Sequence, residues 1–191
     1  DFVASLLGLI LLSPVFLIVA IAIKLEDPKG PVFYSQTRLG RQQLPFKMYK
    51  FRSMIVNDDK LLKKLADQNE VDGAMFKIKR DPRVPNVGRF IRKYSLDELP
   101  QLMNVLLGQM SLVGPRPPLP REVAEYTEYD KQRLFVKPGC TGLWQVTLRN
   151  EAEFSEMVQL DLTYIRQRGI WTDFTIIIKT VGVFFKPNEA Y

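Results

Sequence analysis

The chain has 191 residues, enough to bury one hydrophobic core while leaving little room for a second domain. Its 27 lysines and arginines exceed its 21 aspartates and glutamates, and the net charge of +6 favours an anionic partner such as a phosphorylated ligand, an anionic lipid or a nucleic acid. A single cysteine excludes a disulfide within the chain, and the lack of histidine excludes a Cys/His zinc cluster. Any acid, base or nucleophile therefore has to be a carboxylate, a hydroxyl, a lysine or Cys140.

The sequence starts at Asp1 rather than at a methionine, which indicates a fragment or a trimmed chain. Residues 2–23 carry no charge, and at about 1.5 Å per residue they would extend roughly 33 Å, enough to cross the hydrocarbon core of a bilayer. Pro14 removes a backbone hydrogen bond at the centre of this segment and predicts a kink, where the Ser13 hydroxyl can bind a freed carbonyl. A kinked span and a re-entrant hairpin both fit these residues.

Two strands are expected after this segment. Residues 32–34 form a short apolar run behind a turn-rich linker. Residues 45–53 alternate loosely between apolar and cationic side chains, which is typical of a half-buried strand. Such a strand would present Lys47, Lys50 or Arg52 to an anion, although a solvated basic edge strand is the commoner outcome of this pattern.

A strongly basic region follows these strands. Residues 57–69 have leucines on one side and lysines around them, which fits either a helix on an anionic membrane surface or an ordinary surface helix. Between Lys77 and Lys93 seven basic residues accompany one acid, Asp81, and the proline-rich residues 81–88 are expected to form a loop rather than a helix. No recognition helix or aromatic ladder accompanies this charge, so the sequence does not favour nucleic acid as the partner.

Two adjacent carboxylates, Asp97 and Glu98, stand between this basic lead-in and an apolar run at 102–107 that predicts a buried helix. One interpretation is a capping box, in which Ser95 and Glu98 bind the first amide groups of a helix. Pro100 weakens this interpretation, because it falls too late for a helix that begins at residue 96 and fits better as the first residue of a helix. In the second case both carboxylates lie just ahead of the helix, and the sequence leaves both helix starts open.

A second anion site is expected at Arg116, because prolines on both sides stiffen its loop and suit a bidentate contact with a phosphate. Residues 122–135 are expected to form a charged helix. Residues 137–146 predict a turn followed by a strand, and the glycines there would let backbone amides approach an anion, although a plain turn is the simpler interpretation.

Two helices are expected at the end of the chain. Residues 153–167 carry Asp161 among apolar neighbours, where only exposure to water, a cation or a metal would accommodate a carboxylate. The run from Trp171 to Phe185 is interrupted by Lys179 and therefore predicts an interfacial or packed helix rather than a membrane span.

With these pieces in order, the whole chain resembles the bacterial sugar transferases, the monotopic phosphoglycosyl transferases that act on polyprenyl phosphate. Each matching motif is weak alone, but eight of them in the family's order are strong evidence. They are LSP (12–14), GPVF (30–33), FKMYKFRSM (46–54), DPR (81–83), SLDELPQ (95–101), SLVGPRP (111–117), KPGCTG (137–142) and LDLTYI (160–165).

The resemblance implies an α/β fold, with a re-entrant membrane helix at residues 1–24 broken at Ser13 and Pro14 and a catalytic domain at residues 25–191. It also implies interfacial amphipathic helices and a location on the cytoplasmic face of the bacterial inner membrane. By the same resemblance Asp97 is the nucleophile and Glu98 its acid/base partner, both close to Mg²⁺.

Further site residues follow from the matching positions and from the basic strand. One departure lies nearby, because Thr147 and Leu148 stand where many members carry Asn-Gly. The residues expected to bind substrate phosphates are Arg92, Arg116, Lys50, Arg52 and Arg149, and the expected metal ligands are Asp97, Glu98 and Asp161.

The implied reaction moves a sugar-1-phosphate, expected to be glucose or galactose, from a UDP-sugar to undecaprenyl phosphate as the first membrane step of capsule or exopolysaccharide assembly. UMP is released through an aspartyl-phosphosugar intermediate, and the carboxylate nucleophile divides a transfer between two repelling anions into two displacements. The alternatives are a non-catalytic membrane-bound anion sensor or scaffold and a glycosyltransferase that releases UDP. The sequence does not decide between a monomer and a homo-oligomer.

Overall fold

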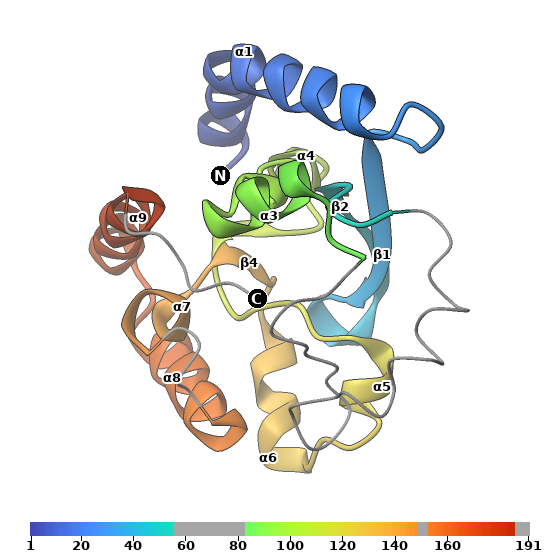
Figure 1. Cartoon of the computed structure of the whole chain (residues 1–191). Helices are drawn as coiled ribbons and strands as arrows, with labels where there is room; N and C mark the ends of the chain where they lie inside the picture. The colour runs from blue at the N-terminus through green and yellow to red at the C-terminus, as the bar shows by residue number, and fades with distance from the viewer. Residues whose placement is uncertain (56–82, 149–152, 186–191) are drawn as a thin grey trace.

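The computed structural model describes residues 1–55, 83–148 and 153–185, and it has the mixed helix and strand content that the sequence predicts. A long N-terminal helix lies over the rest of the molecule, with a β-hairpin on one side and the C-terminal helices on the other (Figure 1). The helices are α1 (Phe2–Glu26), α3 (Asn86–Lys93), α4 (Gln101–Leu106), α5 (Pro120–Val123), α6 (Glu128–Lys131), α7 (Leu143–Thr147), α8 (Phe154–Gln167) and α9 (Ile170–Phe185). The strands are β1 (Phe33–Leu39), β2 (Pro45–Phe51), β3 (Ser111–Val113) and β4 (Gly139–Thr141), and the 3₁₀ turns are η1 (Arg41–Gln43), η3 (Leu96–Glu98) and η4 (Gln132–Phe135).

Helix α1 is bent, as its central proline predicts, so that its first turns run at a steep angle to the rest (Figure 1). Pro14 has no N–H to give to the carbonyl of Ile10, and the Ser13 hydroxyl donates to that carbonyl instead, at 2.8 Å. Among the described residues α1 is the helix long and apolar enough to cross a membrane, and only 11% of its most apolar window is buried. An apolar helix left this exposed has the character of a membrane-embedded segment.

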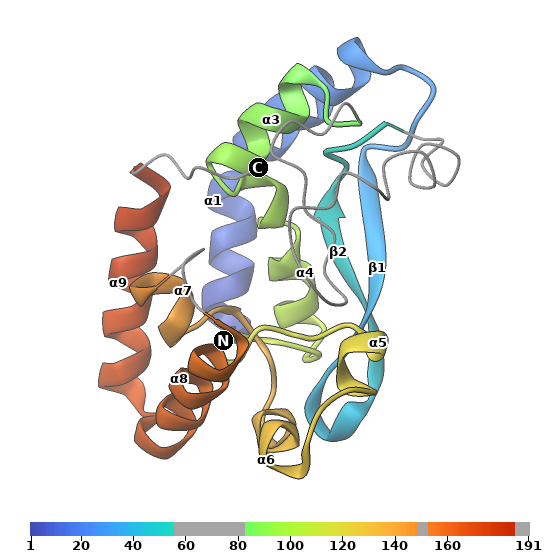
Figure 2. The same cartoon turned by 60° about the horizontal axis from the view of Figure 1, so that its bottom comes forward.

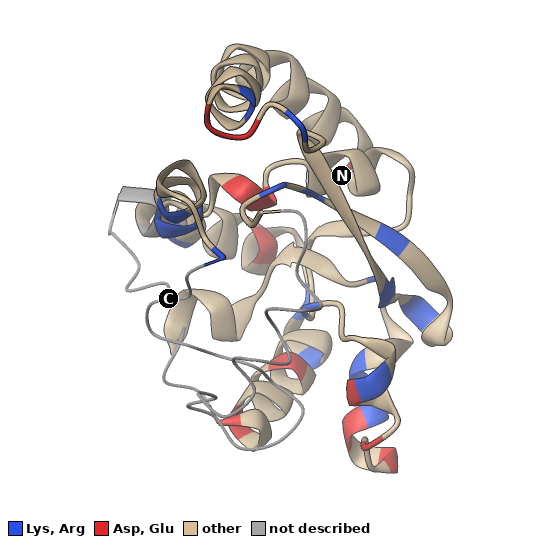
Figure 3. Cartoon of the chain, turned by 45° about the vertical axis from the view of Figure 1, so that its right-hand side comes forward, with Lys and Arg blue, Asp and Glu red and all other residues tan. Residues whose placement is uncertain are grey.

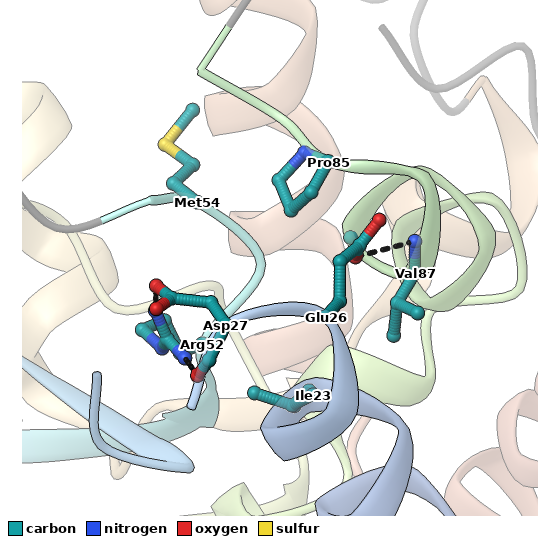
Figure 4. Close-up of a pocket in the computed structure, with 8 residues that line it drawn as sticks. Ile23, Glu26, Asp27, Arg52, Met54, Pro85 and Val87 are labelled. Carbon is teal, nitrogen blue, oxygen red and sulfur yellow. Dashed lines mark hydrogen bonds and ion pairs between the residues drawn. The ribbon is translucent and has the colours of Figure 1, made fainter. Parts of the chain in front are cut away.

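Both ends of α1 are fixed to the same body of the protein. Near the start, the Asp1 carboxylate accepts hydrogen bonds from the Ser111 hydroxyl at 2.7 Å and the Leu112 amide at 3.3 Å. At the far end, the Glu26 carboxylate accepts from the amides of Asn86 and Val87 at 2.8 and 3.0 Å, as Figure 4 illustrates for Val87. Within α1, charged residues occur only toward the C-terminal end, where the helix joins the rest of the protein (Figure 3).

The second half of α1 shares a hydrophobic core with the hairpin and α3. Val19 and Ile23 of α1 pack with Phe51 of β2 and Ile91 of α3. Strands β1 and β2 pair antiparallel from Phe33 opposite Phe51 to Leu39 opposite Pro45, so the two predicted strands are confirmed and β1 is longer than expected.

Strands β3 and β4 pair in parallel and bring the loop that carries Arg116 next to the loop at residues 137–139. The two segments approach each other so closely at Gly114 and Gly139 that a Cβ on Gly139 would lie 2.1 Å from the amide nitrogen of Gly114. Only glycine allows this approach.

Three predictions from the sequence need correction. Residues 143–146, expected as a strand, belong to helix α7, because a helix places both Leu143 and Val146 against the cluster of Val113, Tyr164 and Ile176. The helix expected at 122–135 is divided into α5, α6 and η4, because Thr127 caps a new helix by accepting from the Asp130 amide.

The third correction concerns the loop expected at 81–88. Helix α3 already begins at Asn86, because the Glu26 carboxylate binds its first amide groups from a distant part of the chain. The helix expected at 57–69 lies outside the described residues. The run from Trp171 to Phe185 is helical as predicted, and its helix α9 lies at the edge of the molecule next to α7 and α8 (Figure 2). The side chains of Ile170, Trp171, Phe174 and Ile178 on α9 are exposed.

Candidate active site

The carboxylates Asp97 and Glu98 lie in the 3₁₀ turn η3, between α3 and α4. Ser95 precedes them in a left-handed backbone conformation and makes no side-chain capping bond to the turn. Helix α4 begins only at Gln101, directly after Pro100. Of the two helix starts that the sequence left open, the later one is therefore confirmed, and neither carboxylate is occupied in a capping box.

Glu98 is held by two cations from distant parts of the chain. Its Oε1 lies 2.6 Å from Lys50 Nζ on β2 and 3.3 Å from Arg116 Nη2 in the proline-rich loop. Burial opposes ionisation of Glu98, but Lys50 and Arg116 outweigh burial and lower its pKa to about 2. The structure thus brings together Lys50, Arg116 and the dyad, and Glu98 is ionised at neutral pH.

Asp97 has the opposite environment. Its side chain is buried, and burial together with the neighbouring charge of Glu98 raises its pKa to about 6, although Lys50, Arg92 and Arg116 oppose this rise. Most of the Asp97 carboxylate is still ionised at pH 7. The dyad is therefore a pair of anions packed closely together beside cations contributed by three other segments of the chain.

Such a pair suits Mg²⁺, which proteins usually bind through one or two carboxylates while substrate phosphates and waters complete the shell. The metal site predicted from the sequence included Asp161 as a third carboxylate. The described residues bring no group of three His, Cys, Asp or Glu side chains together, and Asp161 on α8 forms a buried ion pair with Arg133 of η4. Of the three expected metal ligands, Asp97 and Glu98 lie together, and Asp161 is paired with Arg133 instead.

A family profile described as bacterial sugar transferase matches residues 1–187. The chain belongs to this family. It is 45% identical over 191 residues to the galactosyl transferase CpsE of Streptococcus agalactiae serotype III, with all of this chain and 42% of that protein covered. It is 44% identical over 195 residues to the undecaprenyl-phosphate galactose phosphotransferase of Salmonella typhimurium, with all of this chain and 40% of that protein covered.

A third relative is shorter than these two. The exopolysaccharide production protein ExoY of Sinorhizobium fredii is 40% identical over 195 residues, with all of this chain and 86% of ExoY covered. By contrast, the chain spans about two fifths of the length of the first two relatives.

Other predicted site residues of this sugar transferase lie elsewhere. Arg52 was expected to bind a phosphate, but its guanidinium pairs with Asp27 and donates to the Pro31 carbonyl, so that it fixes the segment after α1 (Figure 4). That cation pairs with a residue 25 positions away, which the local strand pattern did not reveal. Arg149 lies outside the described residues, and Ser13 and Pro14 lie at the bend of α1.

Asn104 is a site residue that sequence reasoning missed. It is fully buried on α4, where its Oδ1 accepts from the Tyr49 amide at 2.9 Å and its Nδ2 donates to the Lys47 carbonyl at 2.7 Å. These two bonds hold the helix that follows the dyad against the strand that carries Lys50. The only sequence signal was one amide within an otherwise apolar helical run.

Proposed function

We propose that this chain transfers a sugar-1-phosphate from a UDP-sugar to undecaprenyl phosphate and releases UMP. The observation that carries the proposal is the Asp97–Glu98 dyad, with Lys50 and Arg116 on Glu98 and the charge of Arg92 acting on Asp97. This is an arrangement for a reaction between anions. The name of the Salmonella relative specifies the same acceptor and the sugar galactose, so galactose is the first sugar to test and glucose the second.

The reaction follows from two displacements at one phosphorus. A carboxylate oxygen of Asp97 attacks the phosphorus that bears the sugar, the bond to the bridging oxygen breaks, and UMP leaves with those electrons. A phosphate oxygen of the lipid then attacks the same phosphorus, and the Asp97 carboxylate is released unchanged. Lys50, Arg92 and Arg116 offset the negative charge that both attacking groups bring.

Glu98 suits a charged role better than that of a proton donor, because its two ion pairs favour the ionised form. With Asp97 it would hold Mg²⁺, which neutralises charge on phosphoryl oxygens. Neither displacement requires a proton from Glu98, because the lipid phosphate is already an anion and UMP leaves as one.

A re-entrant α1 would bring this site to the lipid substrate. Both ends of the helix are bound to one body of the protein, through Asp1 at one end and Glu26 at the other. A straight span would separate its ends by roughly the thickness of the bilayer core, about 30 Å. We place the protein on the cytoplasmic face of the bacterial inner membrane, where α1 and the exposed apolar side chains of α9 enter the lipid.

A burst experiment without lipid acceptor tests the proposal. UDP-galactose and Mg²⁺ should give about one UMP per protein and leave a phosphosugar on the chain, which hydroxylamine removes as expected of an acyl phosphate. Asp97→Asn keeps the shape of the side chain but not its nucleophilicity, so the burst and the adduct should both vanish. Glu98→Gln should slow turnover by roughly 10²–10³-fold while the protein stays folded, because a charged group that would hold Mg²⁺ at the reacting phosphates is lost.

The alternatives make different forecasts for the same experiment. A glycosyltransferase that moves the sugar without its phosphate would release UDP. A scaffold whose carboxylates only stabilise the turn would release no nucleotide. An adduct on a peptide other than residues 95–101, or a fully active Asp97→Asn variant, would refute the assignment of the nucleophile.

A further inference from the structure

A cavity of about 410 Å³ opens beside the dyad, within the range of small-molecule sites. Its lining combines three arginines with aromatic rings and two carboxylates, namely Arg38, Arg116, Arg133, Tyr126, Trp144, Phe154, Glu122 and Glu125. Arg116 connects the cavity with the dyad, because it lines the cavity and its Nη2 lies 3.3 Å from Glu98 Oε1. The cavity therefore begins where the proposed reaction takes place.

Polar atoms around the cavity lack partners. Within the described part of the chain, three residues that line the cavity have a buried donor without a hydrogen bond, namely Arg38 Nε, Arg133 Nε and Trp144 Nε1. The Arg133 side chain is only 5% exposed. Burying a donor without a partner destabilises the fold, so three such donors on residues that line one cavity indicate a ligand that supplies the missing partners.

The end of the cavity near the dyad is positively charged. Arg38 of β1 donates to the Pro117 carbonyl at 3.0 Å, so its side chain lies against the loop that carries Arg116. Burial and the neighbouring Arg116 charge lower the pKa of Arg38 to about 10. The Arg116 charge thus disfavours the charge on Arg38, and an anion that contacts both side chains would relieve this repulsion.

The remainder of the cavity suits a flat ring. Tyr126 and Phe154 stand with their ring centroids 5.2 Å apart, and Trp144 lines the same cavity. Two contacts fix the Arg133 side chain beside the Tyr126 ring, because it donates to the Tyr126 hydroxyl at 3.2 Å and forms an ion pair with Asp161. Asp161 is thus a positioning residue for Arg133.

We infer that this cavity binds the uridine monophosphate half of the donor, with the phosphate at Arg38 and Arg116 and the uracil among Tyr126, Trp144 and Phe154. This inference rests on the proposed function. The sugar half is the competing occupant, but it brings no charge beyond the phosphorus that Asp97 attacks. The nucleotide half brings a second phosphate, whose negative charge would offset the positive charges of Arg38 and Arg116.

Uracil also suits the unmet polar atoms. Its edge presents two carbonyl acceptors on either side of a donor, and three residues that line the cavity, Arg38, Arg133 and Trp144, each carry a buried donor without a partner among the described residues. Stacking of a base on an aromatic side chain contributes about 1–3 kcal/mol, which corresponds to roughly 5–150-fold in affinity.

Calorimetry on the full-length protein tests this assignment. UMP and galactose-1-phosphate are titrated separately into the wild type, Trp144→Leu, Trp144→Phe and Trp171→Leu. UMP binding should weaken at least tenfold in Trp144→Leu and by less in Trp144→Phe, which keeps the ring and loses the donor. Trp171, which is exposed on α9, is the matched control, and its replacement should leave UMP affinity unchanged.

Unchanged UMP affinity in a folded Trp144→Leu variant would overturn the inference, and so would loss of galactose-1-phosphate binding in its place. Thermal unfolding of each variant checks the fold. The burst assay separates the two proposals. If the wild type releases UMP and forms the adduct while Trp144→Leu still binds UMP normally, only the assignment of the cavity fails. If UDP is released, the proposed reaction fails whatever the calorimetry reports.

Discussion

Lys50 Nζ lies 2.6 Å from Glu98 Oε1, although the two residues are 48 positions apart in the chain. Lys50 is on an edge of the β-hairpin and Glu98 is in a 3₁₀ turn, so neither element determines the contact alone. Asn104 sets it, because it hydrogen-bonds the backbone of β2 from the helix that follows Glu98. The charge environment of the site therefore depends on a polar anchor that has no chemical role itself.

The first prediction concerns this ion pair. Lys50→Met should leave Glu98 with Arg116 as its remaining cation and lower the rate of UMP release by roughly 10²-fold, because an electrostatic stabiliser of the reacting phosphates is lost. The free energy of unfolding should fall by about 1–3 kcal/mol, since a charged partner is removed from a partly buried group. Urea unfolding and the burst assay measure the two effects.

Lys47→Met is the matched control for this change. Lys47 lies on the same strand but is exposed, and it donates to the Thr37 hydroxyl at 2.9 Å. Its replacement should change the free energy of unfolding by no more than about 0.5 kcal/mol and leave the burst intact. Equal losses in both variants would show that the strand, rather than the Lys50–Glu98 contact, is responsible.

Local patterns predicted the parts of the site that lie within one segment. The dyad, the stiff loop around Arg116 and the bend at Pro14 each depend on neighbouring residues, so motif and proline arguments found them. The two strands also followed from short runs of suitable residues. The helix start after Pro100 could be stated as an alternative for the same reason.

Long-range contacts account for what the sequence did not reveal. Arg52 and Lys50 look alike on one strand, and only the approach of Asp27 to one and Glu98 to the other separates their roles. Asp161 is isolated among apolar residues in sequence, and its partner Arg133 comes from another element. The cavity beside the dyad is lined by residues spread from β1 to α8, so no single segment of the sequence predicts it.

The second prediction is that Cys140 takes no part in the reaction. Burial, together with the nearby Glu98 charge, raises the pKa of its thiol to about 12, so the nucleophilic thiolate is absent at neutral pH. Cys140→Ser should keep most of the UMP burst and the adduct. A loss of several orders of magnitude with the fold intact would contradict the assignment of Asp97 as nucleophile.

The third prediction is a pH dependence of stability from the ion pair at the end of α1. The hydrogen bond and the charge of Arg52 hold the pKa of Asp27 below its ordinary value of 3.8. A carboxyl with a depressed folded-state pKa stabilises the fold above its unfolded pKa, and this contribution is lost as pH falls through the folded value. Asp27→Asn should therefore flatten the decline of the melting temperature below about pH 4.

Arg52→Gln tests the cause of this dependence. Without the guanidinium, Asp27 should titrate near its ordinary value in both states, so the same part of the acid decline should disappear. Melting curves of the wild type and the two variants, recorded from about pH 3 to pH 6, measure it. An unchanged acid decline in both variants would assign it to other carboxylates.

The last prediction concerns the topology of α1. In a Cys140→Ser background, single cysteines are placed at Phe2 and Leu25, which are exposed near the two ends of the helix. If the helix re-enters the bilayer, an impermeant maleimide should label both positions from the cytoplasmic side and neither from the other. A cysteine at Leu11, which is exposed near the bend, should be shielded by lipid from both sides.

The bend itself can then be tested with Pro14→Leu. Leucine at position 14 restores the backbone N–H that the Ile10 carbonyl needs as a partner, so a continuous helix becomes favourable. The segment should then shift toward spanning the membrane, with cysteines at positions 2 and 25 labelled from opposite sides. Ser13→Ala removes only the hydroxyl that binds the Ile10 carbonyl, and it should keep the bend and same-side labelling. Opposite-side labelling in the unsubstituted helix would refute re-entry, because the Asp1 and Glu26 contacts could not then form with the same domain.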